Sequence, residues 1–287
     1  GRFNIVGEID NMKKNTQINL IEGPIAKNIV RFAVPMFLGN LFQQLYNMAD
    51  SLVVGNFLGS SSLAAVTSTG SLIFLLVGFF SGTAMGAGVV ISRFFGAKDY
   101  NNIKKAVHTD IAFGILCGIL MTVVGVIFAP QILSLMGTPD DVFVESVRYI
   151  RIYFLGSLAV IMYNVCMGIL QAVGDSRHPL YYLIISSVVN IILDLLFIGI
   201  FRFGVGSAAL ATIISQFLSV VLCMRRLIKT DDVYRVCIKD IAFDKGILVQ
   251  ILNIGLPSGL QNSIISIANV VVQANINAFG SAAMAGC

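Results

Sequence analysis

Long apolar runs, separated by short polar or Gly/Pro/Ser-rich breaks, dominate the chain. Segments free of Lys, Arg, Asp and Glu cover residues 51–92, 111–139, 152–174, 203–224 and 246–287. Each is at least as long as the roughly 20 apolar residues that cross a bilayer as a helix. Dividing the runs at their breaks predicts seven transmembrane helices, over residues 27–56, 62–92, 108–136, 140–171, 179–201, 207–228 and 248–277.

The composition agrees with this pattern. Of the 287 residues, 56% are hydrophobic and 12% are charged, whereas about a quarter of the residues in a soluble domain are charged. The sequence therefore predicts an all-α, polytopic membrane protein.

Basic residues are concentrated in the N-terminal tail and in the connectors after the second, fourth and sixth predicted helices. Only Arg148, Arg151 and Arg202 fall on the opposite side of the membrane. The positive-inside rule then places the N-terminus in the cytoplasm. No nucleic-acid partner is expected, because the basic charges alternate with Asp residues and no aromatic platform accompanies them.

Of the 15 acidic residues, thirteen fall in predicted connectors, tails or helix ends, whereas Asp50 and Asp194 do not. A charge at the membrane centre costs about 2.5–3.5 kcal/mol on insertion scales and usually faces a cavity or a partner. At a rise of about 1.5 Å per residue, Asp50, Asp194 and Thr212 lie roughly 8–12 Å below the outer surface. Asn190 shares a helix face with Asp194. These oxygen atoms suit an alkali cation or a shared proton, although each acid alone could be a helix-end residue that reaches water.

The first and last predicted helices each carry a polar stripe with a spacing of three to four residues. A polar face on an apolar helix is typical of a water-filled cavity, and hydrogen bonding between helices is the alternative. We expect the stripes to line a substrate cavity through Asn40, Gln43, Gln44, Asn47, Asn262, Ser266, Asn269 and Gln273.

The same two helices are related by an internal repeat. Placing Pro35 on Pro257 aligns two asparagines of the stripes, and residues 57–66 match residues 278–287 after a one-residue gap. Both copies run outward from the cytoplasm, which indicates a parallel repeat whose halves bind substrate between them. Each proline removes a backbone hydrogen bond, so a helix bend is expected at each.

Other candidate residues receive a structural interpretation. Gly82 and Gly86 are spaced for close helix packing. His108 and His178 lie in predicted loops without a second metal ligand nearby. No disulfide or metal spacing connects the cysteines Cys117, Cys166, Cys223, Cys237 and Cys287.

Several motifs together resemble those of the multidrug and toxic compound extrusion (MATE) family, and more narrowly its bacterial DinF-like branch. They are Pro35 followed by Asp50, "RFFGAKD" (93–99), "GILQAVGDSRHP" (168–179), and Asn190, Asp194 and Thr212. The resemblance covers about residues 22–287. It implies an antiporter with two six-helix lobes in the bacterial inner membrane, which works by alternating access. Such an antiporter exports amphipathic, often cationic compounds in exchange for Na⁺ or H⁺ and needs no other cofactor.

The resemblance also assigns a cation or proton site to Asp50, Asn190, Asp194 and Thr212, and it divides the chain into domains. The rest of the second lobe is expected in the same protein, and residues 1–11 are interpreted as a translated leader or as residues added to the natural chain. The expected domains are a cytoplasmic tail (1–26), a six-helix N-lobe (27–228), an inter-lobe linker (229–247) and the first helix of a truncated C-lobe (248–287).

Two other functions, and the absence of function, remain as alternatives. A flippase for lipid-linked saccharides would be expected to present basic residues deep in its helices, and none is found there. An intramembrane aspartyl protease typically has a GxGD pattern in a helix, whereas the only Gly-Asp pair, Gly174–Asp175, lies in a predicted loop. The chain could also be a non-functional fragment. We therefore expect a transporter and not an enzyme.

Overall fold

The computed structural model describes residues 24–277 and 279, and every regular element in this part of the chain is helical. The prediction of an all-α protein is confirmed. Two short elements are the π-helix η1 (Leu195–Ile200) and the 3-10 helix η2 (Ile238–Asp240). The long helices are α2 (Ile25–Leu58), α3 (Ser60–Gly96), α4 (Tyr100–Leu135), α5 (Asp140–Leu155), α6 (Ser157–Ala172), α7 (Arg177–Asp194), α8 (Gly206–Lys229) and α9 (Lys245–Asn277).

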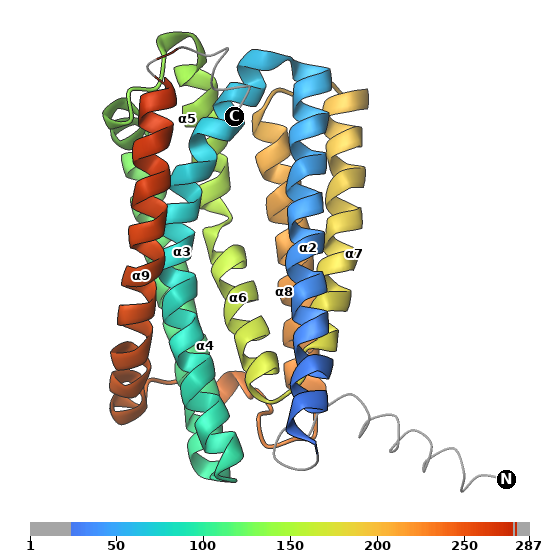
Figure 1. Cartoon of the computed structure of the whole chain (residues 1–287), viewed down its shortest axis with the longest axis vertical. Helices are drawn as coiled ribbons and strands as arrows, with labels where there is room; N and C mark the ends of the chain where they lie inside the picture. Colours follow the sequence, from blue (N-terminus) through green and yellow to red (C-terminus); the bar gives the residue numbers. More distant parts are fainter. Residues whose placement is uncertain (1–23, 278, 280–287) are drawn as a thin grey trace, which may run out of the picture.

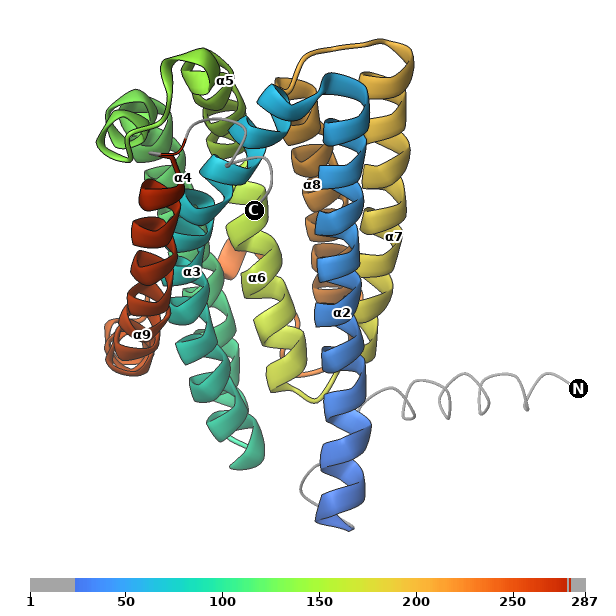
Figure 2. The same ribbon diagram turned by 45° about the horizontal axis from the view of Figure 1, so that its top comes forward.

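The long helices stand side by side, and the chain reverses direction between consecutive helices except between α5 and α6, which follow one another as a bent pair (Figure 1). We call the end at which α2 begins and α3 ends the lower end, as drawn in Figure 1. Helices α2, α7 and α8 pack together on one side, and α9 packs along α3 on the other, as the turned view also shows (Figure 2). Helix α6 contacts α3, α4 and α8, so it joins the two groups.

Four described segments are long and apolar enough to cross a membrane: Ser62–Gly96, Tyr100–Leu135, Arg177–Ile200 and Gly206–Lys229. The pair α5 and α6 would form a fifth if it is one bent span. Helices α2 and α9 contain 34 and 33 residues, but their amide side chains make them more polar. Many large apolar side chains are exposed on the outer faces, as is usual for surfaces that contact lipid. The chain is a multi-pass membrane protein.

The predicted continuous helix over 140–171 is wrong. Gly156 separates α5 from α6, and the two helices meet at an angle of 47°. A Cβ atom built on Gly156 would lie 2.2 Å from Cγ1 of Ile213 in α8. Because only glycine leaves room for this side chain, α8 packs directly against the break.

The predicted start of the third helix at residue 108 is also wrong. Helix α4 begins at Tyr100, where the Asp99 side chain accepts a hydrogen bond from the backbone N–H of Asn102 at 3.3 Å and caps the helix. His108 therefore lies within α4 and is buried, not in a loop. His178 likewise lies in the first turn of α7.

Glycines bring the backbones of α3 and α9 into direct contact. A Cβ atom on Gly86 would lie 2.4 Å from the backbone nitrogen of Gly255, and one on Gly82 would lie 2.6 Å from Cα of Gly259. The predicted packing role of Gly82 and Gly86 is confirmed. Both α2 and α9 continue as α-helix through their prolines, Pro35 and Pro257, so a bend at either residue stays a prediction.

Candidate functional site

A cavity of about 730 Å³ lies among α2, α3, α5, α6, α8 and α9. Four tyrosines border it: Tyr46 from α2, Tyr149 and Tyr153 from α5, and Tyr163 from α6. Asp50 is the only acidic residue among the described residues that border it, and no Lys or Arg is among them. The cavity thus combines aromatic faces with a single carboxyl group, a combination that favours organic cations.

The carboxyl group of Asp50 meets that of Asp194 from the opposite side. Asp50 lies in α2 and is 8% exposed, whereas Asp194 is the last residue of α7 and is fully buried. The two carboxyl groups lie within hydrogen-bonding reach of each other. The Oδ1 atom of each has no hydrogen-bond partner among the described residues. Two carboxyl groups this close cannot both carry an uncompensated charge, so the pair is suited to a shared proton or a bound cation.

Asn190 and Thr212 complete this group. With its amide nitrogen facing Asp194, Asn190 donates to Asp194 Oδ2 at 3.0 Å and accepts from the backbone N–H of Thr212 at 3.2 Å. The Thr212 hydroxyl donates to the carbonyl of Ala208 at 3.0 Å and lies within hydrogen-bonding reach of the Tyr46 hydroxyl. The structure therefore brings Asp50, Asn190, Asp194 and Thr212 together.

The backbone changes from α-helix to π-helix directly after the buried Asp194. The α-helical part of α7 ends at Asp194, and the π-helix η1 begins at Leu195. The wider π turn rotates the following residues relative to a continuous α-helix, and such turns are frequent at functional sites. Nothing in the sequence "LLFIGI" (195–200) predicts this change, since the segment is uniformly apolar apart from one glycine.

Half of the predicted cavity-lining residues border the cavity. Gln43 and Asn47 of α2 do so, as do Asn262 and Gln273 of α9. Four others do not border it: Asn40, Gln44, Ser266 and Asn269. Residues Asn40, Gln44 and Asn269 are exposed elsewhere on their helices, because neighbouring positions on a helix point in different directions. Ser266 is fully buried, and its hydroxyl donates to the carbonyl of Asn262 at 2.8 Å.

The tyrosines of the cavity were not predicted from the sequence. Their signal was present, because Tyr46 lies one helical turn before Asp50, and Tyr149 and Tyr153 are four residues apart. The rings of Tyr149 and Tyr153 stack with their centroids 6.5 Å apart. Aromatic residues are common in membrane helices, so their spacing alone does not distinguish a cavity from ordinary packing.

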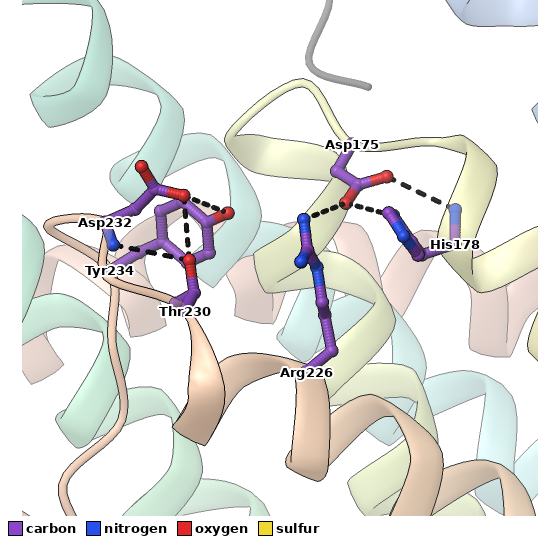
Figure 3. A network of polar contacts seen from close by, with 6 residues as sticks. All are labelled: Asp175, His178, Arg226, Thr230, Asp232 and Tyr234. Atoms are coloured by element: carbon purple, nitrogen blue, oxygen red, sulfur yellow. Dashed lines mark hydrogen bonds and ion pairs between the residues drawn. The ribbon is translucent and has the colours of Figure 1, made fainter. Parts of the chain in front are cut away.

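A second polar network closes the lower end of the bundle, at the predicted "GDSRH" loop (Figure 3). The fully buried Asp175 accepts the backbone N–H of His178 at 3.2 Å and contacts His178 Nδ1 at 2.6 Å. Its Oδ2 also lies 3.9 Å from the guanidinium group of Arg226 near the end of α8. These contacts attach the turn between α6 and α7 to α8, so the loop motif has a structural role.

The described residues contain no group of three or more His, Cys, Asp or Glu side chains placed to hold a metal ion. Apart from an alkali cation at the Asp50–Asp194 pair, the described part of the chain offers no candidate metal centre.

Comparisons with known proteins agree with this architecture. Residues 35–196, more than half of the chain, match the sequence model of the MatE family. The chain is 35% identical over 264 residues to the probable multidrug resistance protein YoeA of Bacillus subtilis (strain 168). The alignment covers 88% of this chain and 56% of YoeA. The chain thus spans little more than half of that relative's length.

Solved structures give the same result. The inward-facing conformation of a multidrug resistance MATE transporter of the MOP superfamily aligns with a TM-score of 0.80 and 29% identity, over 90% of this chain and 59% of that one. The outward-facing conformation of a multidrug resistance MATE transporter of the MOP superfamily aligns with a TM-score of 0.81 and 29% identity. This alignment covers 88% of this chain and 56% of that one. On the family match and this shared fold, the chain belongs to the MatE family of multidrug and toxic compound extrusion (MATE) transporters.

Proposed function

We propose that this chain forms the first lobe, and the first helix of the second lobe, of a cation-coupled drug antiporter. The antiporter exports amphipathic, often cationic organic compounds by alternating access, in exchange for Na⁺ or H⁺. We place it in the bacterial inner membrane with its N-terminus in the cytoplasm, where the positive-inside rule puts the basic connectors. The names of the MATE relatives support drug export as the activity.

One observation carries this proposal: Asp50 belongs both to the cavity and to the acidic pair. Its side chain borders the cavity, whereas Asp194 and Asn190 lie behind it, away from the cavity. A positively charged substrate in the cavity and a coupling ion at the pair therefore depend on the same carboxyl group.

The shared carboxyl group explains how export and ion entry are coupled. When a proton or Na⁺ occupies the pair, the negative charge of Asp50 is compensated and the cavity loses its attraction for an organic cation. When the ion leaves, Asp50 can again pair with the substrate, and the tyrosine faces add cation–π attraction. Two ligands that prefer different states of one site are coupled reciprocally.

The charge of the cavity also separates this proposal from the flippase alternative. A lipid pyrophosphate would require basic side chains, and neither Lys nor Arg is found among the described residues that border the cavity. The single acidic residue instead favours a cationic ligand.

The proposal is tested by Asp194→Asn in membrane vesicles that accumulate a fluorescent cationic dye. This variant keeps Asp50 in the cavity but removes the second acid of the pair, so we expect export driven by a Na⁺ or pH gradient to be lost. Asp141→Asn is the matched control, because Asp141 is exposed in the first turn of α5, away from the cavity. Export by the Asp194→Asn variant at the rate of the control, at equal amounts of inserted protein, would contradict the proposal.

A further inference from the structure

A third acid, Asp110, is buried inside the helical bundle, away from the cavity and from the Asp50–Asp194 pair. It lies in α4 and is 1% exposed. It borders neither the cavity nor the smaller pocket at the lower end of the molecule. Asp110 therefore has a different environment from the acids that the proposed transport mechanism uses.

Neither carboxyl oxygen of Asp110 has a hydrogen-bond partner among the described residues. The acid shares one face of α4 with Ile103, Val107, Gly114 and Cys117, all of them buried. At Gly114 this face touches α6, where an added Cβ atom would lie 2.7 Å from Val165. The carboxyl group is thus held between packed apolar surfaces, where an ionised carboxylate without donors is strongly disfavoured.

No basic side chain compensates for this burial. Two thiols, Cys117 of α4 and Cys166 of α6, lie within electrostatic range of Asp110. The nearest basic side chains along α4 have other partners. Lys104 pairs with Asp240 at 2.7 Å and Lys105 with Asp244 at 3.4 Å. His108 accepts the backbone N–H of Cys237 at 3.0 Å. A negative charge on the Asp110 carboxyl group would consequently be uncompensated.

From this arrangement we infer that Asp110 is a second proton-binding site of this lobe, which holds its proton while the lower part of α4 stays covered and releases it when this part of α4 opens to water. The ligand is a proton and not Na⁺, because a hard metal cation requires several oxygen ligands, whereas the identified titratable neighbours of Asp110 are thiols. As a neutral acid, Asp110 gains an O–H group that can donate to a helix carbonyl, as Ser and Thr do.

The surroundings of α4 provide a way to open this site. A pocket of about 360 Å³ at the lower end reaches Thr109, the residue before Asp110. The segment 237–244 covers this part of α4, and the Thr109 hydroxyl accepts the backbone N–H of Asp244 at 3.1 Å. Because this segment leads directly into α9, a movement of α9 would lift it from α4 and bring water closer to Asp110. Proton binding at Asp110 would then favour the closed packing of α4.

Infrared spectroscopy of the purified chain in lipid nanodiscs tests this inference independently of transport. The C=O stretch of a protonated carboxyl group absorbs apart from the carboxylate bands. The parent for the experiment is the Asp50→Asn/Asp194→Asn variant, in which the acidic pair is removed. We expect a protonated-carboxyl band in this parent at mildly alkaline pH, and its complete loss on the further substitution Asp110→Asn.

Two controls keep the result decisive. Asp240→Asn removes an exposed, ion-paired carboxylate and should leave the band unchanged. If Asp110→Asn does not fold, the parent alone decides: the band must persist at mildly alkaline pH in the folded chain and disappear when the chain is unfolded at the same pH. Absence of the band from the folded parent, or its persistence in a folded Asp110→Asn chain, overturns the inference.

Discussion

Replacing Gly86 with alanine tests the backbone contact between α3 and α9, the helix that forms one wall of the cavity. A Cβ atom at this position would lie 2.4 Å from the nitrogen and 2.5 Å from Cα of Gly255, both of them backbone atoms. A rotamer change cannot relieve this overlap. The helices have to separate by about 1 Å, and overpacking of this kind costs about 1–3 kcal/mol.

Gly88→Ala is the matched control, two residues further along the same helix. Its Cβ atom would lie 3.7 Å from the carbonyl oxygen of Gly168, an ordinary contact. Without a clash, Gly→Ala in a helix interior stabilises by about 0.5–1 kcal/mol. We expect Gly86→Ala to lower the free energy of unfolding and Gly88→Ala to leave it unchanged or raise it.

Thermal unfolding in detergent, followed with a thiol-reactive dye, measures the difference, because Cys117, Cys166 and Cys223 are buried in the folded chain. At about 2–4 °C per kcal/mol, the unfolding temperature of Gly86→Ala should fall by roughly 2–12 °C. Equal unfolding temperatures for the two variants would refute the backbone contact between α3 and α9.

Three further predictions concern the lower end of the molecule. Asp175→Asn removes the charged acceptor of the buried network and should lower the free energy of unfolding by about 1–3 kcal/mol, measured by the same thermal assay; an unchanged stability would mean that the network is dispensable. The hydrogen bond and charge of Lys104 lower the pKa of the Asp240 carboxyl, so this contact stabilises the fold above the ordinary pKa of about 4 and is lost as the pH falls below it. The protection of the backbone amides of residues 237–244 from hydrogen exchange, taken relative to the intrinsic rate at each pH, should therefore fall at acidic pH in the wild type, and Lys104→Gln should remove this pH dependence. Burial raises the pKa of Tyr234 to about 12, so its contribution to stability is complete below the ordinary pKa of about 10 and is lost as the pH rises toward the folded value; the absorbance titration should lose a component near this pH in Tyr234→Phe, and an unaltered curve would contradict the assignment.

The acidic pair could be located from the sequence because a carboxylate in an apolar run is rare and costly. Helix geometry alone placed Asp50, Asp194 and Thr212 at a common depth. Asp110 could not be recognised in the same way. It lies at the edge of an apolar run, close to Lys104 and Lys105, and resembles an ordinary helix end. Its burial depends on packing against α6. The spacing of Ile103, Val107, Asp110 and Cys117 nevertheless places Asp110 on one helix face with apolar residues, which was a usable signal of burial.

Breaks in helix geometry were not predictable from local sequence. The residues around Gly156 form one apolar run with the pattern of a single helix, and the break depends on Ile213, which approaches from α8. The π-helix after Asp194 is also formed by residues that suit an α-helix. At Gly156, tertiary packing overrides a weak local preference.

The most direct test of the account is the affinity of the purified chain for a cationic dye, measured at neutral and acidic pH and with and without Na⁺. Because Asp50 serves both the cavity and the acidic pair, occupation of the pair by a proton or Na⁺ should weaken dye binding in the wild type by about tenfold or more, the equivalent of about 1.4 kcal/mol. Asp194→Asn should still bind the dye but lose most of this dependence. A wild-type affinity that is the same under every condition, or an Asp194→Asn variant that keeps the full dependence, would contradict the claim that substrate and coupling ion share Asp50.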